Sequence, residues 1–287
     1  MTAPAAPPGT HRYGPAPSQY AELYLPAART RPGTAVLVHG GYWRARYDAG
    51  LGRPLAADLA ARGWVAWNLE YRRTGGPEGD RGGWPETFED VAAGIDLLAP
   101  VLGSLGLEPG PVVVVGHSAG GHLGAWAAGR HTLPAGAPGS GPAVRPAGVV
   151  SQAGVLDLAE AGRLGLSDGA ARELMGADPE RDPERWALAD PARMLPIGVP
   201  VVALHGDADD AVPDALSRGY ARAARAAGDP ARFAWMPGDH FAPITPGTAA
   251  WEACVDALSE LTGARRDRPG AAPGRPRGRG GAARPVY

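Results

Sequence analysis

The sequence predicts an α/β fold in which a mostly parallel, doubly wound sheet is covered by helices on both faces. Two continuous apolar runs, 34–38 and 111–116, lack the alternation of a half-exposed strand and are typical of strands buried on both faces. Segments with helical spacing follow such runs along the chain, and this order favours a parallel sheet. With 287 residues, of which 44% are hydrophobic, the chain can bury a sizeable core.

Strands and helices are expected to alternate from Tyr20 to the region of residue 262. The expected strands are 34–38, 64–69, 111–116, 148–154, 199–206 and 231–236. The expected helices are 54–62, 87–98, 119–129, 213–227 and 247–262. Local signals mark some of their ends. Pro54 suits the first turn of a helix and Gly63 its end, and Thr87 with Asp90 three residues later predicts a helix-capping pair.

The composition divides the chain into a flexible leader, 1–18, one α/β domain, 19–263, and a disordered tail, 264–287. The leader is broken by Pro and Gly, and the tail is rich in Arg, Gly and Pro, a composition that cannot form a core. Within the domain, residues 157–196 contain short helical pieces separated by Gly and Pro, which predicts a small helical cap.

The formal net charge is −2, but it is unevenly spread along the chain. The tail holds seven arginines and one aspartate, so it contributes +6 and the rest of the chain carries −8. A mildly acidic body gives no reason to expect nucleic acid as a partner of the main domain. Arg/Gly repeats of the tail can bind phosphates, although a solvated end is the simpler interpretation.

Cysteine usage and hydropathy bear on the compartment. Cys254 is the single cysteine, so no disulfide can form within the chain, which suits a reducing compartment. The first residues show no charged start followed by an apolar core, and no stretch of eighteen apolar residues occurs. We therefore expect a soluble, cytoplasmic protein without membrane contact, and the sequence leaves its oligomeric state open.

A G-x-S-x-G motif, Gly116-His117-Ser118-Ala119-Gly120, follows the apolar run that ends at residue 116 and opens an expected helix. The motif alone is weak evidence in a chain with 43 glycines. Its context is specific, because a strand, a tight turn and a helix form the nucleophile elbow that exposes a serine hydroxyl. We therefore predict Ser118 as a nucleophile.

A serine nucleophile needs a histidine base and an acid to orient it. Of the histidines after Ser118, His240 is the one that lies beyond the last expected strand, on a loop suited to a mobile base. The turn that follows the strand 199–206 offers the acid. Asp209 is preferred, and three neighbouring carboxylates remain open as alternatives: Asp207, Asp210 and Asp214.

The stretch His39-Gly40-Gly41-Tyr42-Trp43 follows a strand and predicts an oxyanion-binding loop. Glycines let the backbone approach a substrate closely, and fixed N–H groups stabilise the anion that forms when a serine attacks a carbonyl. We assign the amides of Gly41, Tyr42 and Ala119 as donors, with Tyr42 and Trp43 as wall or support.

Several neighbouring polar residues have structural interpretations. His39 is expected to hydrogen-bond within its own loop. Glu70 is expected to anchor that loop or to pair with Arg72 or Arg73. For His117 and His122, which flank the elbow, substrate contact is the less favoured interpretation.

No cofactor is expected. The sequence contains no H-E-x-x-H motif and no Cys/His cluster with metal-ligand spacing, and no G-x-G-x-x-G follows a strand. The acidic run 207–210 offers ligands to a divalent ion, but its position after a strand favours the role of a catalytic acid.

Together these motifs resemble the α/β-hydrolase superfamily. The segments that carry the resemblance are HGGYW (39–43), NLEYR (68–72), GHSAGG (116–121), HGDADDAVP (205–213) and DHF (239–241). Within the superfamily, the chain is similar to serine-type kynurenine formamidases and related bacterial esterase/lipase-like hydrolases over about residues 20–262. The resemblance implies a nucleophile at Ser118, an acid at Asp209, a base at His240 and an oxyanion loop at 39–43.

The resulting hypothesis is a serine hydrolase that cleaves a small ester or amide through a covalent acyl-enzyme. Family resemblance implies an aryl formamide such as N-formylkynurenine as one substrate. A general carboxylesterase or a short-peptide hydrolase of the same fold is the alternative reaction. A non-catalytic binding module on a hydrolase fold is the alternative of another class, and the presence of all three triad candidates makes it less favoured.

Overall fold

The computed structural model describes residues 9–264, and within them eight strands form one sheet. The strands are β1 Gly9–Arg12, β2 Tyr20–Tyr24, β3 Thr34–Val38, β4 Val65–Leu69, β5 Val112–His117, β6 Gly148–Gln152, β7 Val201–Gly206 and β8 Ala231–Met236. Their order across the sheet is β1-β2-β4-β3-β5-β6-β7-β8; β1 and β2 are antiparallel to their neighbours and all other pairs are parallel. The predicted mostly parallel sheet is confirmed.

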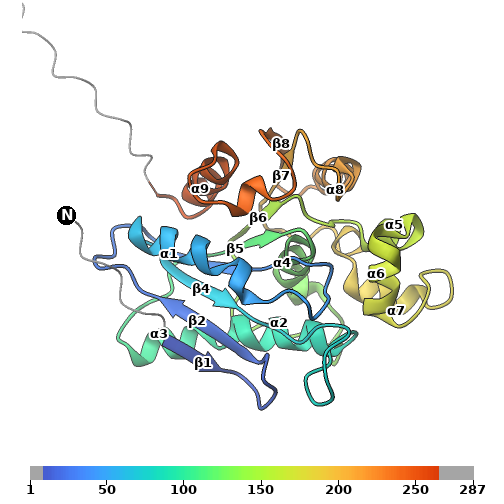
Figure 1. The fold of residues 1–287 in the computed structure, drawn as a ribbon, viewed down its shortest axis with the longest axis horizontal. Coiled ribbons are helices and arrows are strands. Elements are labelled where there is room, and N and C mark those ends of the chain that lie inside the picture. The colour runs from blue at the N-terminus through green and yellow to red at the C-terminus, as the bar shows by residue number, and fades with distance from the viewer. Residues whose placement is uncertain (1–8, 265–287) are drawn as a thin grey trace, which may run out of the picture.

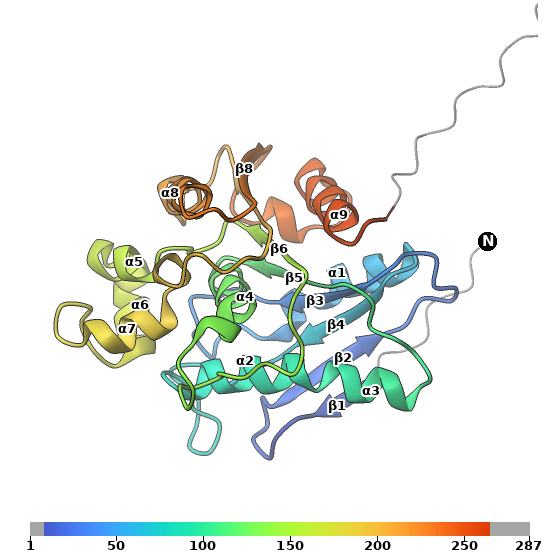
Figure 2. The same ribbon diagram turned by 180° about the vertical axis from the view of Figure 1, so that it is seen from behind.

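Helices cover both faces of this sheet (Figures 1 and 2). The helices are α1 Arg53–Ala61, α2 Glu86–Asp96, α3 Leu98–Ser104, α4 Ala119–Gly129, α5 Leu158–Leu164, α6 Leu166–Met175, α7 Pro183–Ala189, α8 Asp214–Ala226 and α9 Ala249–Leu261. The buried side chains of α1 and α9 pack against one face, and those of α2, α4 and α8 against the other. Among the helices of residues 9–264, none is long and apolar enough to cross a membrane.

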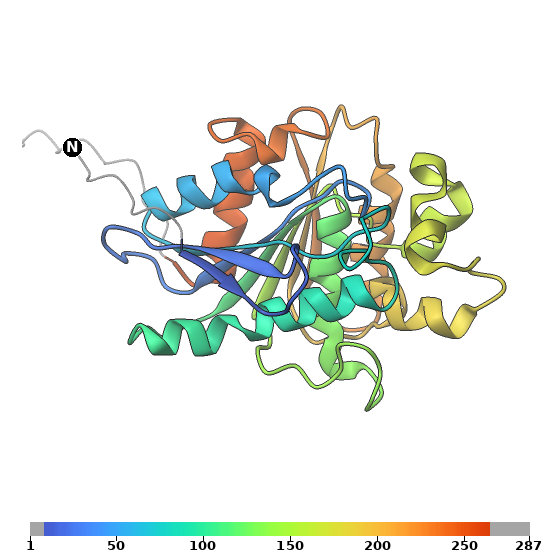
Figure 3. The ribbon, with the colours of Figure 1, turned by 60° about the horizontal axis from the view of Figure 1, so that its bottom comes forward.

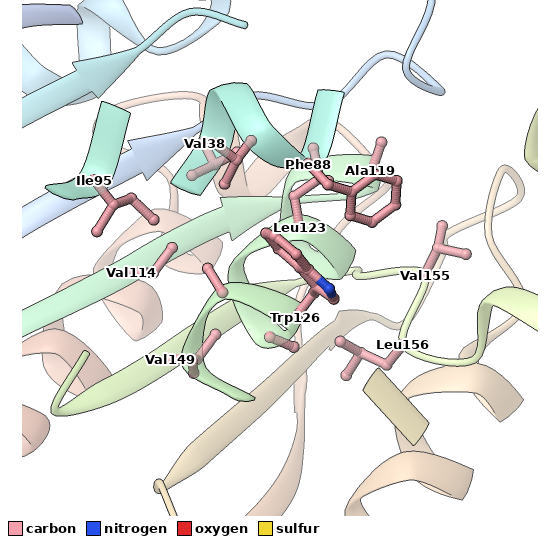
Figure 4. Close-up of a cluster of buried hydrophobic side chains, with 14 of the residues drawn as sticks. Val38, Phe88, Ile95, Val114, Ala119, Leu123, Trp126, Val149, Val155 and Leu156 are labelled. Carbon is pink, nitrogen blue, oxygen red and sulfur yellow. The ribbon is translucent and has the colours of Figure 1, made fainter. Parts of the chain in front are cut away.

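Helix α4, which begins next to Ser118, packs against α2 and the sheet through a cluster of buried apolar side chains (Figure 4). Phe88 from α2 contacts Trp126 from α4 with ring centroids 5.0 Å apart. Leu123 and Val114 are fully buried in the same cluster. Because protein interiors are close-packed, this contact surface fixes the position of α4, and with it the turn that presents the serine.

Helices α5, α6 and α7 form a small cap to one side of the sheet (Figures 1 and 3). The buried carboxylate of Asp190, which follows α7, accepts hydrogen bonds from the amides of Leu158 and Ala159 at the start of α5, at 3.0 and 3.1 Å. These hydrogen bonds connect the two ends of the cap. Arg44, next to the predicted oxyanion loop, reaches the cap and donates to the carbonyl of Ser167 at 2.8 Å and to Glu173 at 3.0 Å. The cap is therefore tied to the loop that precedes α1.

The prediction of a flexible leader over residues 1–18 is wrong for residues 9–18. Residues 9–12 form β1, a polar edge strand whose backbone pairs with β2. Tyr13 donates through its hydroxyl to the carbonyl of Glu70 at 2.6 Å, and Ser18 donates to Asp80 at 2.7 Å. Backbone pairing needs no apolar side chains, so the composition did not reveal it. Residues 1–8, and 265–287 of the predicted tail, lie outside the described residues.

The predicted capping role of Thr87 is also wrong. Helix α2 begins one residue earlier, at Glu86. The Thr87 hydroxyl donates to the carbonyl of Arg72 at 2.7 Å, and Asp90 accepts from the guanidinium and amide of Arg72 at 2.8–2.9 Å. Both side chains hold the segment that follows β4, a tertiary contact that local sequence cannot specify.

Candidate active site

Ser118 lies in a sharp turn between β5 and α4, with a backbone conformation that few non-glycine residues adopt. Its φ is 53° and its ψ is −116°, a strained combination of the kind found at functional sites. The flanking glycines permit the turn. A Cβ on Gly116 would lie 2.2 Å from the carbonyl oxygen of Gly120, and a Cβ on Gly120 would lie 2.0 Å from that of Val38. The serine is therefore presented at the carboxyl end of β5 and the N-terminus of α4.

The structure brings Asp209 and His240 together. His240 follows β8 and Asp209 follows β7, and His240 Nδ1 lies 2.7 Å from Asp209 Oδ2. The other oxygen of Asp209 accepts from the amides of Ala211 and Val212 at 2.9 and 3.0 Å. Burial alone would raise the pKa of Asp209, but the hydrogen bonds from His240 and these amides outweigh it and hold the pKa below its ordinary value.

An ionised Asp209 selects one form of the neutral imidazole. A carboxylate can only accept, so His240 carries a proton on Nδ1 and leaves the lone pair of Nε2 free. In this form the ring can remove a proton from a serine hydroxyl. The pair therefore has the arrangement required of an acid that orients a base.

The alternative acids are turned away from His240. Asp207 accepts from the amide of Gly238 at 2.9 Å, and Asp214 pairs with Arg218. Asp210 is exposed. Each of these carboxylates therefore either has another partner or faces solvent.

The side chain of His205, which precedes this turn, supports the turn through buried hydrogen-bond contacts. Its ring is buried between the hydroxyl of Ser217 and the carbonyl of Val212, with both contacts at 2.9 Å. Burial lowers the pKa of His205, which favours its neutral form.

His117, the residue before Ser118, contacts the loop that carries His240. Its Nε2 lies 2.8 Å from the carbonyl oxygen of His240, and the two ring centroids are 4.6 Å apart. Burial, reinforced by the neighbouring His240, lowers the pKa of His117 to about 3, so its ring is neutral and donates to that carbonyl. The sequence placed His117 beside the elbow but could not show this contact, which joins the loop that carries His240 to the residue before Ser118.

His122 has a structural contact on the cap side. Its Nε2 bonds to the carbonyl of Ala189 at 2.8 Å, and the ring is fully buried. It lies edge-on to Trp43, with ring centroids 5.2 Å apart. His122 is therefore part of the packing between α4, the oxyanion loop and the cap.

The backbone of the predicted oxyanion loop comes close to Ser118 at Gly40. A Cβ on Gly40 would lie 3.0 Å from the Cβ of Ser118. The next three residues all have positive φ: 107° at Gly41, 50° at Tyr42 and 57° at Trp43. Within residues 9–264, the amides of Gly41, Tyr42 and Ala119 donate no hydrogen bond, so these three N–H groups are free to bind an anion.

The two aromatic residues of the loop take different positions. The Tyr42 hydroxyl donates to the carbonyl of Ala211 at 2.6 Å, which ties the loop to the segment that aligns Asp209. Trp43 is buried, with 1% of its surface exposed. Trp43 therefore supports the loop from the core, and Tyr42 links the donor loop to the acid loop.

A buried ionic network lies behind the oxyanion loop. Glu70 accepts from the amide of Ala49 at 2.7 Å and from the guanidinium of Arg73 at 2.5 Å. His39 contacts the same carboxylate through Nε2, at 3.1 Å. Of the two predicted partners, Glu70 therefore pairs with Arg73, while Arg72 pairs with Asp90.

Residues 9–264 contain no group of three His, Cys, Asp or Glu side chains arranged to hold a metal ion. Cys254 is buried in α9.

The model of the BD-FAE family matches residues 21–223, which include Ser118, the segment 39–43 and Asp209. The chain belongs to the BD-FAE family. The esterase LipQ of Mycobacterium tuberculosis is 27% identical over 237 residues, which are 79% of this chain and 54% of LipQ. A probable isoprenylcysteine alpha-carbonyl methylesterase of Oryza sativa, ICMEL1, is 36% identical over 115 residues, 39% of this chain and 25% of the relative. The chain thus spans about half the length, or less, of these curated relatives.

Solved structures with the same fold include several esterases. A truncated carbohydrate esterase from gut microbiota has a TM-score of 0.75 and 22% identity, covering 91% of this chain and 99% of that one. Esterase B of Lactobacillus rhamnosis, inhibited by a tributyrin phosphonate, has a TM-score of 0.72 and 21% identity, covering 92% and 87%. Esterase 2 of Thermogutta terrifontis with bound propionate has a TM-score of 0.66 and 25% identity, covering 88% and 93%. These likenesses confirm the predicted α/β-hydrolase fold.

Proposed function

We propose that this chain is a carboxylic ester hydrolase that forms an acyl-enzyme on Ser118, with His240 as base and Asp209 as orienting acid. The observation that carries the proposal is the 2.7 Å contact between His240 Nδ1 and Asp209, with His240 held beside the elbow by His117. The family and its esterase relatives support the same reaction class.

The proposed reaction begins when Ser118 Oγ attacks the ester carbonyl carbon and its proton passes to His240 Nε2. The carbonyl oxygen becomes an anion, which the amides of Gly41, Tyr42 and Ala119 stabilise. Removing one such donor typically costs about 10²–10³ in kcat. The intermediate collapses, and His240 returns the proton to the departing alcohol.

Water completes the cycle. His240 Nε2 removes a proton from a water molecule, which attacks the acyl carbon of the acyl-enzyme. A second oxyanion forms in the same donor set and collapses to release the carboxylic acid and Ser118. Asp209 stays ionised and stabilises the imidazolium that appears in both halves of the reaction.

We propose a small ester as the substrate. Ser118 and His240 are 1% and 4% exposed, which favours a substrate slim enough to enter a recessed site. An aryl formamide such as N-formylkynurenine is the second candidate, supported by the resemblance of the HGGYW loop to kynurenine formamidases. A short peptide is the third. The esterase relatives favour the ester. The single cysteine supports the cytoplasm as the proposed location.

A substrate panel tests the proposal. The values of kcat/KM would be measured for p-nitrophenyl acetate, N-formyl-L-kynurenine and a dipeptide, with Ser118→Ala as the blank. We expect turnover of the ester that Ser118→Ala abolishes. A formamide preference of several orders of magnitude would replace the ester with an aryl formamide. Full activity in Ser118→Ala would overturn the mechanism.

A fluorophosphonate probe separates enzyme from binding module. The wild-type chain should be labelled covalently and Ser118→Ala should not. Absence of labelling in folded wild-type protein would favour a non-catalytic module on a hydrolase fold.

A further inference from the structure

His39 is a buried histidine that the proposed reaction does not use, and both of its ring nitrogens face acceptors. Its side chain is fully buried. Nδ1 lies 2.8 Å from the carbonyl oxygen of Gly40, and Nε2 lies 3.1 Å from Glu70 Oε1. A carbonyl oxygen and an ionised carboxylate can only accept hydrogen bonds. A neutral imidazole has one N–H, so it cannot satisfy both contacts.

Glu70 cannot act as the hydrogen-bond donor in its contact with His39. Its oxygens accept from the amides of Ala49 and Tyr71 at 2.7 and 2.8 Å and from Arg73 at 2.5 Å. Arg73 is always a cation, and it and the two backbone N–H donors favour the ionised form of the carboxylate. Glu70 is therefore an anion, and both protons of the two contacts belong to His39.

The surroundings suit an imidazolium at this position. The His39 ring is stacked on Tyr71, with ring centroids 4.4 Å apart and planes 13° apart. The charged groups that face this cluster are the anion of Glu70 and the cation of Arg73, while the ring of His117 is neutral. The Tyr71 hydroxyl also donates to the His39 carbonyl at 2.8 Å, which holds the residue in place. An imidazolium at His39 would share the Glu70 carboxylate with Arg73.

The carbonyl that His39 binds belongs to the same peptide unit as an assigned oxyanion donor. The C=O of Gly40 and the N–H of Gly41 are the two ends of one peptide bond. A charge-assisted hydrogen bond to the oxygen of a peptide polarises the unit, and chains of hydrogen bonds strengthen one another. The N–H of Gly41 therefore becomes a stronger donor when Gly40 accepts from a cation.

We propose that a His39 imidazolium, held by Glu70, polarises the Gly40–Gly41 peptide and so strengthens the Gly41 amide as an oxyanion donor. This inference rests on the proposed function. His39 and Glu70 are positioning residues, since neither is assigned a contact with the substrate. They stabilise the charge that develops on the substrate oxygen in the transition state. Their loss should therefore lower kcat and leave KM nearly unchanged.

Nitrogen NMR tests the charge state without any need for turnover. Protein labelled with ¹⁵N-histidine would be recorded near pH 8, and His39→Gln would identify the His39 signals by their disappearance. We expect both His39 nitrogens to resonate as protonated nitrogens. One protonated and one unprotonated nitrogen would show a neutral ring and overturn the inference.

Kinetics test the consequence. Arg73, the amide of Tyr71 and His39 Nε2 all meet one oxygen of Glu70, Oε1. Glu70→Gln removes the negative charge but can keep an oxygen at this position, and a neutral His39 then keeps only one of its two contacts. Both Glu70→Gln and His39→Gln should lower kcat about tenfold with little change in KM. Their affinity for a trifluoromethyl ketone, whose serine adduct carries the oxyanion, should fall by the same factor.

The control is Asp96→Asn, which breaks the ion pair between the partly exposed Asp96 and the buried Arg130 at the far end of α4. It should lower stability without lowering kcat. Unchanged kcat and inhibitor affinity in folded Glu70→Gln and His39→Gln would mean that the network only holds the loop, and would overturn the inference. A wild-type chain that shows the imidazolium but hydrolyses no substrate would overturn the proposed function, and this inference with it.

Discussion

Asp209→Asn tests the orientation of the base with almost no change of shape. The oxygen that accepts from the amides of Ala211 and Val212 can stay where it is. The amide nitrogen then replaces the oxygen that lies 2.7 Å from His240 Nδ1. Because that nitrogen donates, Nδ1 must become the acceptor and the proton moves to Nε2. His240 in this form cannot remove the proton of Ser118.

The expected loss follows from this change of tautomer. The same substitution in a Ser-His-Asp triad costs about 10⁴ in kcat, which corresponds to about 5.5 kcal/mol of barrier. We expect a loss of that order for p-nitrophenyl acetate, measured as kcat at saturating ester with the enzyme concentration determined by absorbance. Thermal unfolding of the variant, followed by circular dichroism, should confirm that it is folded.

Asp207→Asn and Asp210→Asn are the matched controls, since neither carboxylate contacts His240. Both variants should keep kcat within a few-fold of the wild type. If Asp209→Asn kept a tenth or more of the wild-type kcat, or if a control variant lost as much activity as Asp209→Asn, the assignment of the orienting acid would be refuted.

Three further substitutions have definite expected outcomes. Gly40→Ala places a methyl group 3.0 Å from the Cβ of Ser118, so steady-state assays should show kcat reduced about 100-fold by the displaced loop. Glu70→Gln removes a carboxyl whose folded-state pKa is lowered, so the stability that the charge contributes is present above its ordinary pKa and lost as pH falls through the lowered value. Urea unfolding between pH 7 and 3 should show the gap between wild type and this variant closing on acidification. Asp96→Asn leaves the guanidinium of Arg130, 2% exposed, without its carboxylate, and urea unfolding should show a loss of about 3 kcal/mol with kcat unchanged.

Much of the fold could be predicted because its strands and helices carry strong local patterns. The expected strands 34–38 and 231–236 and the expected helix 119–129 coincide with β3, β8 and α4. Buried parallel strands read as continuous apolar runs, and glycines mark the elbow. In contrast, β1 is a short polar edge strand held by backbone pairing, and no side-chain pattern announces it.

The residues of the candidate site could be proposed from the sequence, but several of their contacts could not. Four carboxylates lie within eight residues after β7, and a sequence cannot show which of them the backbone turns toward His240. The amides that orient Asp209 become visible in the folded loop. His117 reaches a carbonyl 123 residues away in sequence, and His39 shares Glu70 with Arg73. Such contacts form because the fold brings segments that are far apart in the sequence together at the carboxyl edge of the sheet.

Trapping the acyl-enzyme tests the central claim most directly. Wild-type protein and Ser118→Ala would be mixed briefly with p-nitrophenyl acetate, quenched in acid and measured by intact-protein and peptide mass spectrometry. The proposed mechanism predicts one acetyl group on the wild-type chain, located on Ser118, and none on the variant. An acetyl group on another residue, or ester hydrolysis by Ser118→Ala at the wild-type rate, would contradict it.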